Sequence, residues 1–186
     1  MGTARKLQKA LNETAALILF VAFFSGCAMS ESGSSEAVRA FRKEVKETRD
    51  VLVPALMDAV ANRDPQSVRA ILGKKCVAAG ESGRPFSCGI AVLDLHGITL
   101  HSITPGEPSK RIDYSTYEAV KTALKEKKAV KARAFLQDHT TLYAVNIPLV
   151  RNGEAIGILV LAFDASDLRN RYHLTEEEFL KMDLDG

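Results

Sequence analysis

The sequence predicts an α+β domain in which a long N-terminal helix packs on a five-stranded antiparallel sheet. Apolar residues recur at three- and four-residue spacing over 36–62, and this is the period of an amphipathic helix. Five β-prone runs follow, and one helical stretch separates the first two from the last three. Hairpins separated by a single helix favour an antiparallel sheet over an alternating parallel one.

The chain begins with the pattern of a secretory signal peptide. Arg5, Lys6 and Lys9 precede an apolar run over 14–24, which is far shorter than the ~20 residues that a membrane-spanning helix needs. The next residues, Phe24-Ser25-Gly26-Cys27, resemble a bacterial lipobox. This resemblance implies cleavage before Cys27 and acylation of that cysteine, palmitate included, which would anchor the protein to a membrane. The alternatives are an ordinary signal peptide with an incidental cysteine, or an amphipathic N-terminal helix.

The predicted organisation is a signal peptide over 1–26, a lipidated cysteine and flexible tether over 27–35, and one domain over 36–186. The tether is predicted because the sequence after Cys27, AMSESGSS, is small and polar. After residue 26 the chain holds 22 basic and 22 acidic side chains and shows no basic stripe. A neutral chain of this kind argues against nucleic-acid binding.

The other two cysteines, Cys76 and Cys88, are predicted to form a disulfide, since export would place them in an oxidising compartment. Closing a loop of this size stabilises by roughly 3 kcal/mol in the chain-entropy account. The alternatives are a zinc site that adds His96 and His101, although no C-x2-C pair is present, and a redox-responsive pair that opens and closes. The prediction includes neither a metal nor a cofactor.

Several short signals predict where the helices begin and end. Pro54 is expected to kink the long helix or restart it near Val51. Asp64-Pro65 predicts an N-cap and the first residue of a short helix, with an end near Gly73. The same kind of signal predicts a capping box at Ser115-x-x-Glu118, a cap at Asp164 or Ser166, and another capping box at Thr175-x-x-Glu178.

The strands are predicted in two groups. The run CGIAVLDLHGITLHS contains two strands around His96-Gly97, and Asp94 is expected to shape the turn. The runs AVKARAFLQ, TLYAVNIPLVR and EAIGILVLAFD are the other three strands. Asn152-Gly153 joins the last two and is the strongest short hairpin signal that a sequence offers.

These elements resemble the Cache family, the PAS-like extracytoplasmic sensor domains of bacterial receptors. The run AVLDLHGITLHS is similar to the family's first hairpin, YSTYEAVKTALKEKKAV to its middle helix, and LYAVNIPLVRNGEAIGILVLAFDASDL to its closing hairpin. The resemblance covers 36–168 and implies a pocket for a small metabolite, often a carboxylate or an amino acid. The Tyr–Arg–Trp cluster of the amino-acid-binding members is missing, since the chain has no Trp.

The face that binds this ligand can be predicted from hairpin parity. A two-residue turn places Arg151 opposite Glu154 and Leu149 opposite Ile156. If Gln137 pairs with Thr140, one face is entirely apolar apart from the Tyr143 hydroxyl, and the other face mixes apolar residues with polar ones. Ligand pockets have this mixed composition. The candidate ligand-binding residues are Arg133, Lys131, Asn146, Tyr117 and Phe135.

In this interpretation the Arg133 guanidinium clamps a carboxylate and Lys131 adds a charge. The alternative is that both cations lie on an exposed part of the sheet and keep it soluble. A three-residue turn at Gln137–Thr140 would reverse the parity and remove this assignment.

No catalytic set is recognisable, because the sequence contains neither a G-x-S-x-G nor an H-E-x-x-H motif. An enzyme is therefore not predicted. The lipobox and the resemblance to the Cache family imply a membrane-anchored extracytoplasmic sensor lipoprotein, which binds an anionic or zwitterionic metabolite and acts with an envelope signalling partner. The alternative is an envelope interaction lipoprotein that has the same fold but docks a protein through the helix over 36–62.

Overall fold

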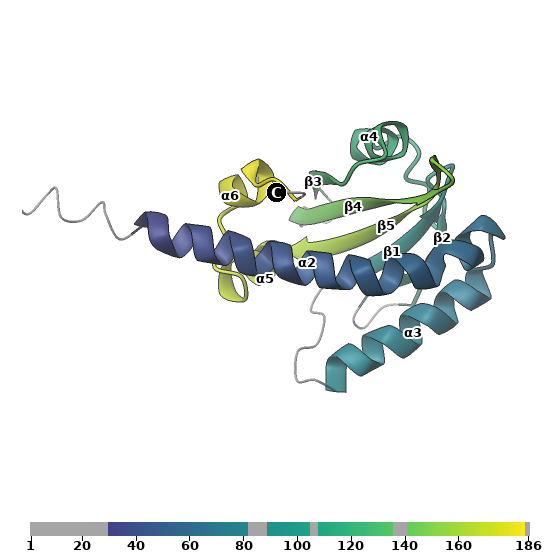
Figure 1. Cartoon of the computed structure of the whole chain (residues 1–186), viewed down its shortest axis with the longest axis horizontal. Coiled ribbons are helices and arrows are strands. Elements are labelled where there is room, and N and C mark those ends of the chain that lie inside the picture. The colour runs from purple at the N-terminus through teal and green to yellow at the C-terminus, as the bar shows by residue number, and fades with distance from the viewer. Residues whose placement is uncertain (1–29, 82–88, 105–107, 136–140, 185–186) are drawn as a thin grey trace, which may run out of the picture.

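The computed structural model describes residues 30–81, 89–104, 108–135 and 141–184. These residues form three layers, in which a five-stranded antiparallel sheet lies between two helical layers (Figure 1). The predicted α+β class is confirmed. Two of the predicted features lie outside the described residues, namely Cys27 with the signal peptide and Cys88. The side chain of Cys76 is not described either, so lipidation and the disulfide stay predictions.

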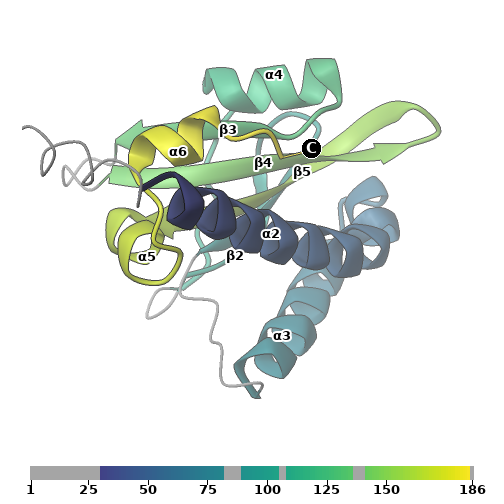
Figure 2. The same cartoon turned by 60° about the vertical axis from the view of Figure 1, so that its left-hand side comes forward.

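The helices have unequal lengths and positions. The long N-terminal helix is α2 (Ser30–Ala61), and α3 (Pro65–Glu81) follows it after a tight turn. Helix α4 (Glu118–Glu126) lies between the second and third strands in the sequence. The chain closes with α5 (Ala165–Asn170) and α6 (Glu176–Lys181). Helix α2 covers one face of the sheet and α4 covers the other (Figures 1 and 2).

The sheet has the strand order β2-β1-β5-β4-β3. Its strands are β1 (Ile90–Asp94), β2 (Thr99–Ile103), β3 (Val130–Phe135), β4 (Thr141–Arg151) and β5 (Glu154–Asp164). Both predicted turns are confirmed. Asn152 and Gly153 have φ of 52° and 81°, as a two-residue type I′ turn requires, and Asp94 Oδ1 accepts hydrogen bonds from the backbone N–H groups of His96 and Ile98.

The main core lies between α2 and the sheet. Phe41, Leu52 and Leu56 of α2 are at most 4% exposed and pack with the inward side chains of β4 and β5. A smaller core lies under α4, where Val120 and Ala123 contact Leu93 and Ile158. Because consecutive strand residues point to opposite faces, the same strands supply both cores.

The predicted parity of the sheet is wrong at two places. A bulge between Leu149 and Val150 pairs Leu149 with Gly157 instead of Ile156. Strand β3 pairs through Phe135 and Thr141, which leaves an odd number of residues in the connection. Lys131 therefore lies opposite Val145 and Arg133 opposite Tyr143. Each shift by one residue moves the side chains of a strand to the other face, so the faces assigned to β3 and β5 are exchanged relative to β4.

Four helix boundaries differ from the prediction. Helix α2 begins at Ser30, before the predicted Glu36, because the polar tract ahead of Glu36 has no proline to interrupt a helix. The restart predicted near Val51 does not occur, because α2 is continuous through the exposed Pro54. Helix α3 likewise continues past Gly73 to Glu81. The capping box at Ser115 is absent: Asp113 accepts the Ser115 N–H, and α4 begins three residues later.

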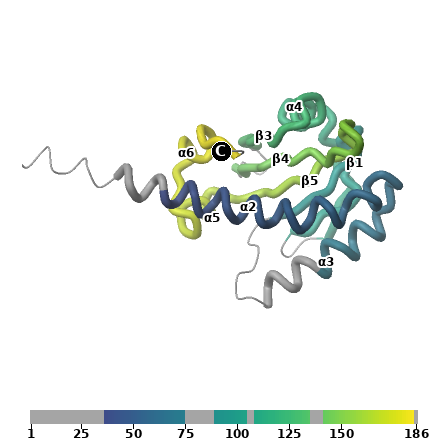
Figure 3. Tube along the Cα trace, viewed as in Figure 1, coloured from purple at the N-terminus to yellow at the C-terminus, as the bar shows by residue number. Residues whose placement is uncertain are grey.

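The segment that follows β5, residues 165–184, is here called the C-terminal strap. It contains α5 and α6 and folds back beside the N-terminal half of α2 (Figure 3). The predicted caps at its helices are confirmed. Asp164 accepts a hydrogen bond from the Asp167 N–H, and the Thr175–Glu178 capping box is complete. Its buried aromatic residues, Tyr172 and Phe179, join the core under α2.

Gly157 allows the sheet and α2 to approach closely. A Cβ atom at this position would lie 2.4 Å from the carbonyl oxygen of Leu93 and 2.6 Å from Cγ1 of Val60. We expect Gly157→Ala to destabilise the protein by about 1–3 kcal/mol, because the neighbouring strand and α2 would have to move apart. The matched control is Gly73→Ala in α3, where nothing lies within 4 Å of the added Cβ and where alanine should stabilise the helix by ~0.5–1 kcal/mol. Urea unfolding of both variants measures the difference, and equal effects would contradict the close approach.

Candidate functional site

A cavity of about 310 Å³ lies on the sheet face that α4 covers. Its floor is made by β1, β3, β4 and β5, and its roof by α4 together with the segment 108–117. Small-molecule sites have this size and are mostly apolar with few polar groups. Such a cavity between sheet and roof is the candidate ligand site.

The cavity exists because a row of very small residues crosses the sheet beneath it. This row, here called the alanine row, comprises Gly89, Ala162, Ala144 and Ala132. Each member is paired to the next across neighbouring strands. Larger aliphatic side chains at these positions would fill the space between the sheet and α4. The floor is thus an apolar trough that runs across the strands, because its members are paired from one strand to the next.

Two polar side chains lie on either side of this row. Asn146 is two residues from Ala144 along β4, and Asp164 is two residues from Ala162 along β5. The two positions are four residues apart along the strands, or roughly 13–14 Å at the usual rise of a β-strand. Their side chains point to the same face, so a ligand that lies parallel to the strands, across the row, would have a polar group near each end.

Both of these side chains offer acceptor oxygens to the cavity. Asn146 is 4% exposed, and its Nδ2 atom donates to the carbonyl oxygen of Val130 at 3.2 Å. This bond leaves Oδ1 as the amide atom available to a ligand. Asp164 accepts from Asp167 N–H at 2.7 Å and from Ser166 Oγ at 2.6 Å, both at Oδ1. The Ser166 hydroxyl and these backbone groups lower the pKa of the Asp164 carboxyl, so it is ionised at neutral pH.

Tyrosines and one lysine lie at the mouth of the cavity. Tyr117 is 43% exposed and packs edge-on against the half-buried Tyr114, with ring centroids 5.4 Å apart. Burial raises the pKa of the Tyr114 hydroxyl, so this group is a neutral donor. Lys110 is the one cationic side chain among the described lining residues.

The first hairpin turn holds this mouth in place. Gly97 has a φ of 77° and accepts a hydrogen bond from the Tyr114 N–H at 2.9 Å. Thr99 donates to the carbonyl oxygen of Ile112 through both its N–H group and its hydroxyl. These hydrogen bonds hold the segment 108–117 against the first hairpin, and so fix its position above the trough.

The structure separates the predicted ligand-binding residues into two groups. Asn146 and Tyr117 line the cavity, and their binding of a ligand stays a prediction. The prediction for Arg133 and Lys131 is wrong, because both lie on the α2 face of the sheet and contact the C-terminal strap. Arg133 pairs with Glu176, and Lys131 donates to the carbonyl oxygens of Leu180 and Met182. The side chain of Phe135 is not among those that the structure describes.

A substitution of Arg133 tests whether this residue binds the ligand or only pairs with Glu176. We expect Arg133→Ala to leave ligand-induced thermal stabilisation unchanged, since the guanidinium is on the face opposite the cavity. The free energy of unfolding should fall by only ~0–1 kcal/mol, because both side chains are about 40% exposed and water screens the pair. Thermal melts with and without a bound ligand test this, and a lost ligand response would restore Arg133 to the binding site.

Sequence reasoning missed the alanine row, and for Asp164 it favoured a helix cap over a ligand contact. Alternation in β3 groups Ala132 with Ala134, and alternation in the closing hairpin groups Ala144 with Asn146. The small residues were visible as a pattern, but the wrong register put Ala132 and Ala134 with the apolar core. Asp164 was predicted as a helix cap, and it is a cap as well as a lining residue.

Three solved structures are similar to this fold. A domain of a protein assigned to the sensory box/GGDEF family from Vibrio parahaemolyticus matches with a TM-score of 0.58 and 15% identity, and covers 79% of this chain and 62% of its own. The extracellular domain of a protein assigned as the histidine kinase vpHK1S-Z8 matches with a TM-score of 0.58 and 16% identity, over 78% and 58%. That of mmHK1S-Z2 matches with a TM-score of 0.53 and 12% identity, over 75% and 60%.

The chain therefore has the PAS-like fold of Cache-type sensor domains, as its sequence predicted. It spans about three fifths of the length of these three chains. No protein-family model and no curated protein matches the sequence. No helix within the described ranges is long and apolar enough to cross a membrane. At this level of identity the likeness concerns the fold, and the function has to be argued from the cavity.

Proposed function

We propose that this protein is an extracytoplasmic sensor that binds a small molecule in the cavity above the alanine row. The observation that carries the proposal is the row itself. Three paired strand positions and the residue before β1 hold only alanine or glycine, where the opposite face of the sheet carries a tightly packed core. A row of small residues of this kind sacrifices apolar burial that larger side chains would provide. A bound ligand would fill that volume and restore the apolar burial.

The charges of the cavity define the ligand class. The expectation of an anionic ligand depended on Arg133 and Lys131, which lie on the other face. Asp164 is ionised and Asn146 carries an amide carbonyl oxygen, so the two sides of the row favour hydrogen-bond donors. The proposed ligand is a compact, mostly apolar molecule with an ammonium group at Asp164. A zwitterion also meets this requirement, because Lys110 at the mouth can face a carboxylate.

The location and anchoring of the protein belong to the same proposal. The pattern over 1–27 supports export and acylation of Cys27, which would hold the domain at a membrane surface outside the cytosol. The similar extracellular domains support an extracytoplasmic position. A signalling partner in the envelope would then read the state of the bound domain. Labelling with a radioactive fatty acid, and its loss in Cys27→Ser, tests the anchor.

Thermal-shift titration with three molecules that share one apolar body tests the ligand class. Leucine carries an ammonium and a carboxylate, isoamylamine carries the ammonium alone, and 4-methylpentanoate carries the carboxylate alone. We expect stabilisation by the two ammonium compounds and none by the acid. Asp164→Asn should abolish the response, because the neutral amide cannot pair with an ammonium. The acid binding as well as the amine, or an unchanged response in Asp164→Asn, would contradict this assignment.

A further inference from the structure

Asp164 belongs to two parts of the molecule at the same time. It lines the cavity at the end of β5, and it is the N-cap of α5, the first helix of the C-terminal strap. Both cap bonds use Oδ1, through the Asp167 N–H and the Ser166 hydroxyl. An ionised carboxylate has about four acceptor sites, so it can also accept from a group inside the cavity. One carboxylate thus connects the ligand site to the segment that leaves the sheet.

The strap is fastened to the N-terminal half of α2 by Glu44. Its Oε1 atom accepts hydrogen bonds from the Arg171 guanidinium at 2.5 Å and from the Tyr172 hydroxyl at 3.0 Å. The Arg171 and Glu44 side chains are 23% and 27% exposed, so water screens this pair less than it screens a surface pair. Phe41, one turn before Glu44, contacts the rings of Tyr172 and Phe179.

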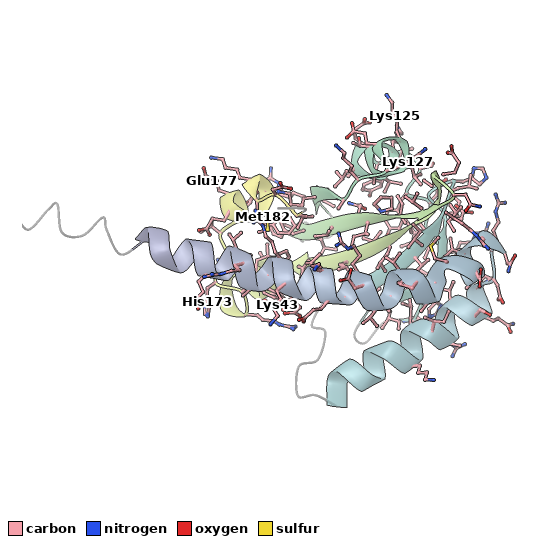
Figure 4. All side chains as sticks on the ribbon, viewed as in Figure 1. Lys43, Lys125, Lys127, His173, Glu177 and Met182 are labelled. Carbon is pink, nitrogen blue, oxygen red and sulfur yellow. The ribbon has the colours of Figure 1, made fainter. Side chains whose placement is uncertain are left out.

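The strap is also fastened to the sheet at both ends of α6. At the start of α6, Glu176 accepts hydrogen bonds from Arg133 and from the Tyr143 hydroxyl. At its end, Lys131 Nζ donates to the carbonyl oxygens of Leu180 and Met182. Figure 4 shows Met182 and Glu177 close together beside the N-terminal half of α2. The strap is therefore a docked element with contacts to α2, β3 and β4.

We infer that occupation of the cavity at Asp164 and docking of the strap on α2 stabilise each other. The inference rests on the proposed function, and it describes how ligand binding in the cavity would change the docking of the strap. A docked strap holds α5 in place, and α5 fixes the Asp164 carboxylate through its cap bonds. A cation bound by Asp164 meets a carboxylate that is already oriented, so the docked form is the form that binds best. By linkage, the bound form must then dock more strongly.

The coupling leads towards the N-terminus of the domain. The strap contacts α2 at Phe41 and Glu44, near the start of the described part of the chain. A ligand on the α4 face of the sheet would thereby alter contacts on the opposite face, in the half of α2 that is nearer to the proposed anchor. The Cache-like sheet is the rigid part in this scheme, and the strap is the part with two states.

A tethered cation tests the coupling without any ligand. Ala162→Lys places an ammonium group in the trough on the same strand and face as Asp164, and Ala162→Met fills the same space without charge. We expect amide hydrogen exchange in residues 165–184 of the full chain to be at least threefold slower in Ala162→Lys than in Ala162→Met. The difference should disappear when Asp164→Asn is added to both. Equal or faster exchange in the lysine variant would overturn the inference.

The reverse direction is tested in a variant that leaves the cavity intact. Glu44→Gln weakens the bond to Arg171, and Lys43→Gln is the matched control on the exposed side of the same helix (Figure 4). We expect Glu44→Gln alone to accelerate exchange in the strap several-fold. The pKa of Asp164, measured by carboxyl NMR, should rise towards its ordinary value near 3.8 as the cap bonds loosen. An unchanged pKa, with or without faster exchange, would overturn the coupling.

These two experiments fail independently of the proposed ligand. Isoamylamine that stabilises the natural chain but binds Glu44→Gln and Lys43→Gln equally well would overturn the coupling and leave the ligand site standing. Absence of any amine response in the natural chain, combined with the expected exchange difference in Ala162→Lys, would overturn the ligand class and leave the coupling standing.

Discussion

Ala144→Leu should abolish the response to isoamylamine and leave the unliganded protein at least as stable as the natural chain. Ala144 is central in the alanine row, with Ala132 on one side and Ala162 on the other. A leucine there would occupy the trough from below and remove the space that the ligand needs. Filling a cavity commonly stabilises a protein by ~0.5–2 kcal/mol, which corresponds to a rise in Tm of a few degrees for a domain of this size.

The matched control for this variant is Ala70→Leu on the exposed side of α3. It adds the same side chain far from the cavity and should leave the thermal shift unchanged. Thermal melts of both variants with and without isoamylamine make the comparison. A normal shift in Ala144→Leu would mean that the ligand binds elsewhere. A large loss of unliganded stability would mean that the space above the row is already filled.

Phe41→Ala should produce the largest loss of stability. The Phe41 side chain is fully buried, and its ring centroid lies 5.2 Å from that of Phe163, 4.9 Å from that of Tyr172 and 5.7 Å from that of Phe179. Removing such a ring typically costs ~3–5 kcal/mol. A domain commonly has only ~5–15 kcal/mol in total, so this variant should be close to unfolding at 37 °C.

The control for Phe41→Ala is Val51→Ala on the same helix, at a position that is 49% exposed. Its effect should be within about 0.5 kcal/mol, as is usual for surface substitutions. Urea unfolding gives both free energies. Similar losses in the two variants would show that burial under the strap contributes little, and the aromatic cluster would then not be the main contact between α2 and the strap.

The strands could be predicted almost to the residue, and the ligand face could not. The ends of β4 and β5 follow from the alternation of apolar residues around Asn152-Gly153, a turn that tolerates few other sequences. The register depends on features that carry no such local signal. A bulge after Leu149 and an odd connection before Thr141 each exchange the two faces of a strand. The odd connection alone explains why the sequence placed Arg133 on the cavity face.

Helix boundaries likewise could be predicted where local hydrogen bonds set them, and could not be predicted where tertiary contacts set them. The caps at Asp64, Asp164 and Thr175 were predicted because their hydrogen bonds lie within three residues in the sequence. The box at Ser115 failed because Asp113 takes the Ser115 N–H and the Gly97 turn holds the chain there. Contacts from a distant hairpin decide that boundary, and a local pattern does not contain them.

The two faces of the central strands can change independently during evolution. Ala144 and Asn146 point into the cavity, and the residues between and beside them in β4 point into the core under α2. A substitution in the alanine row would therefore alter which molecules fit without disturbing the packing that folds the domain. Domains with this fold could acquire new specificities through single exchanges among glycine, alanine, serine and valine on this floor, while their scaffold stays the same.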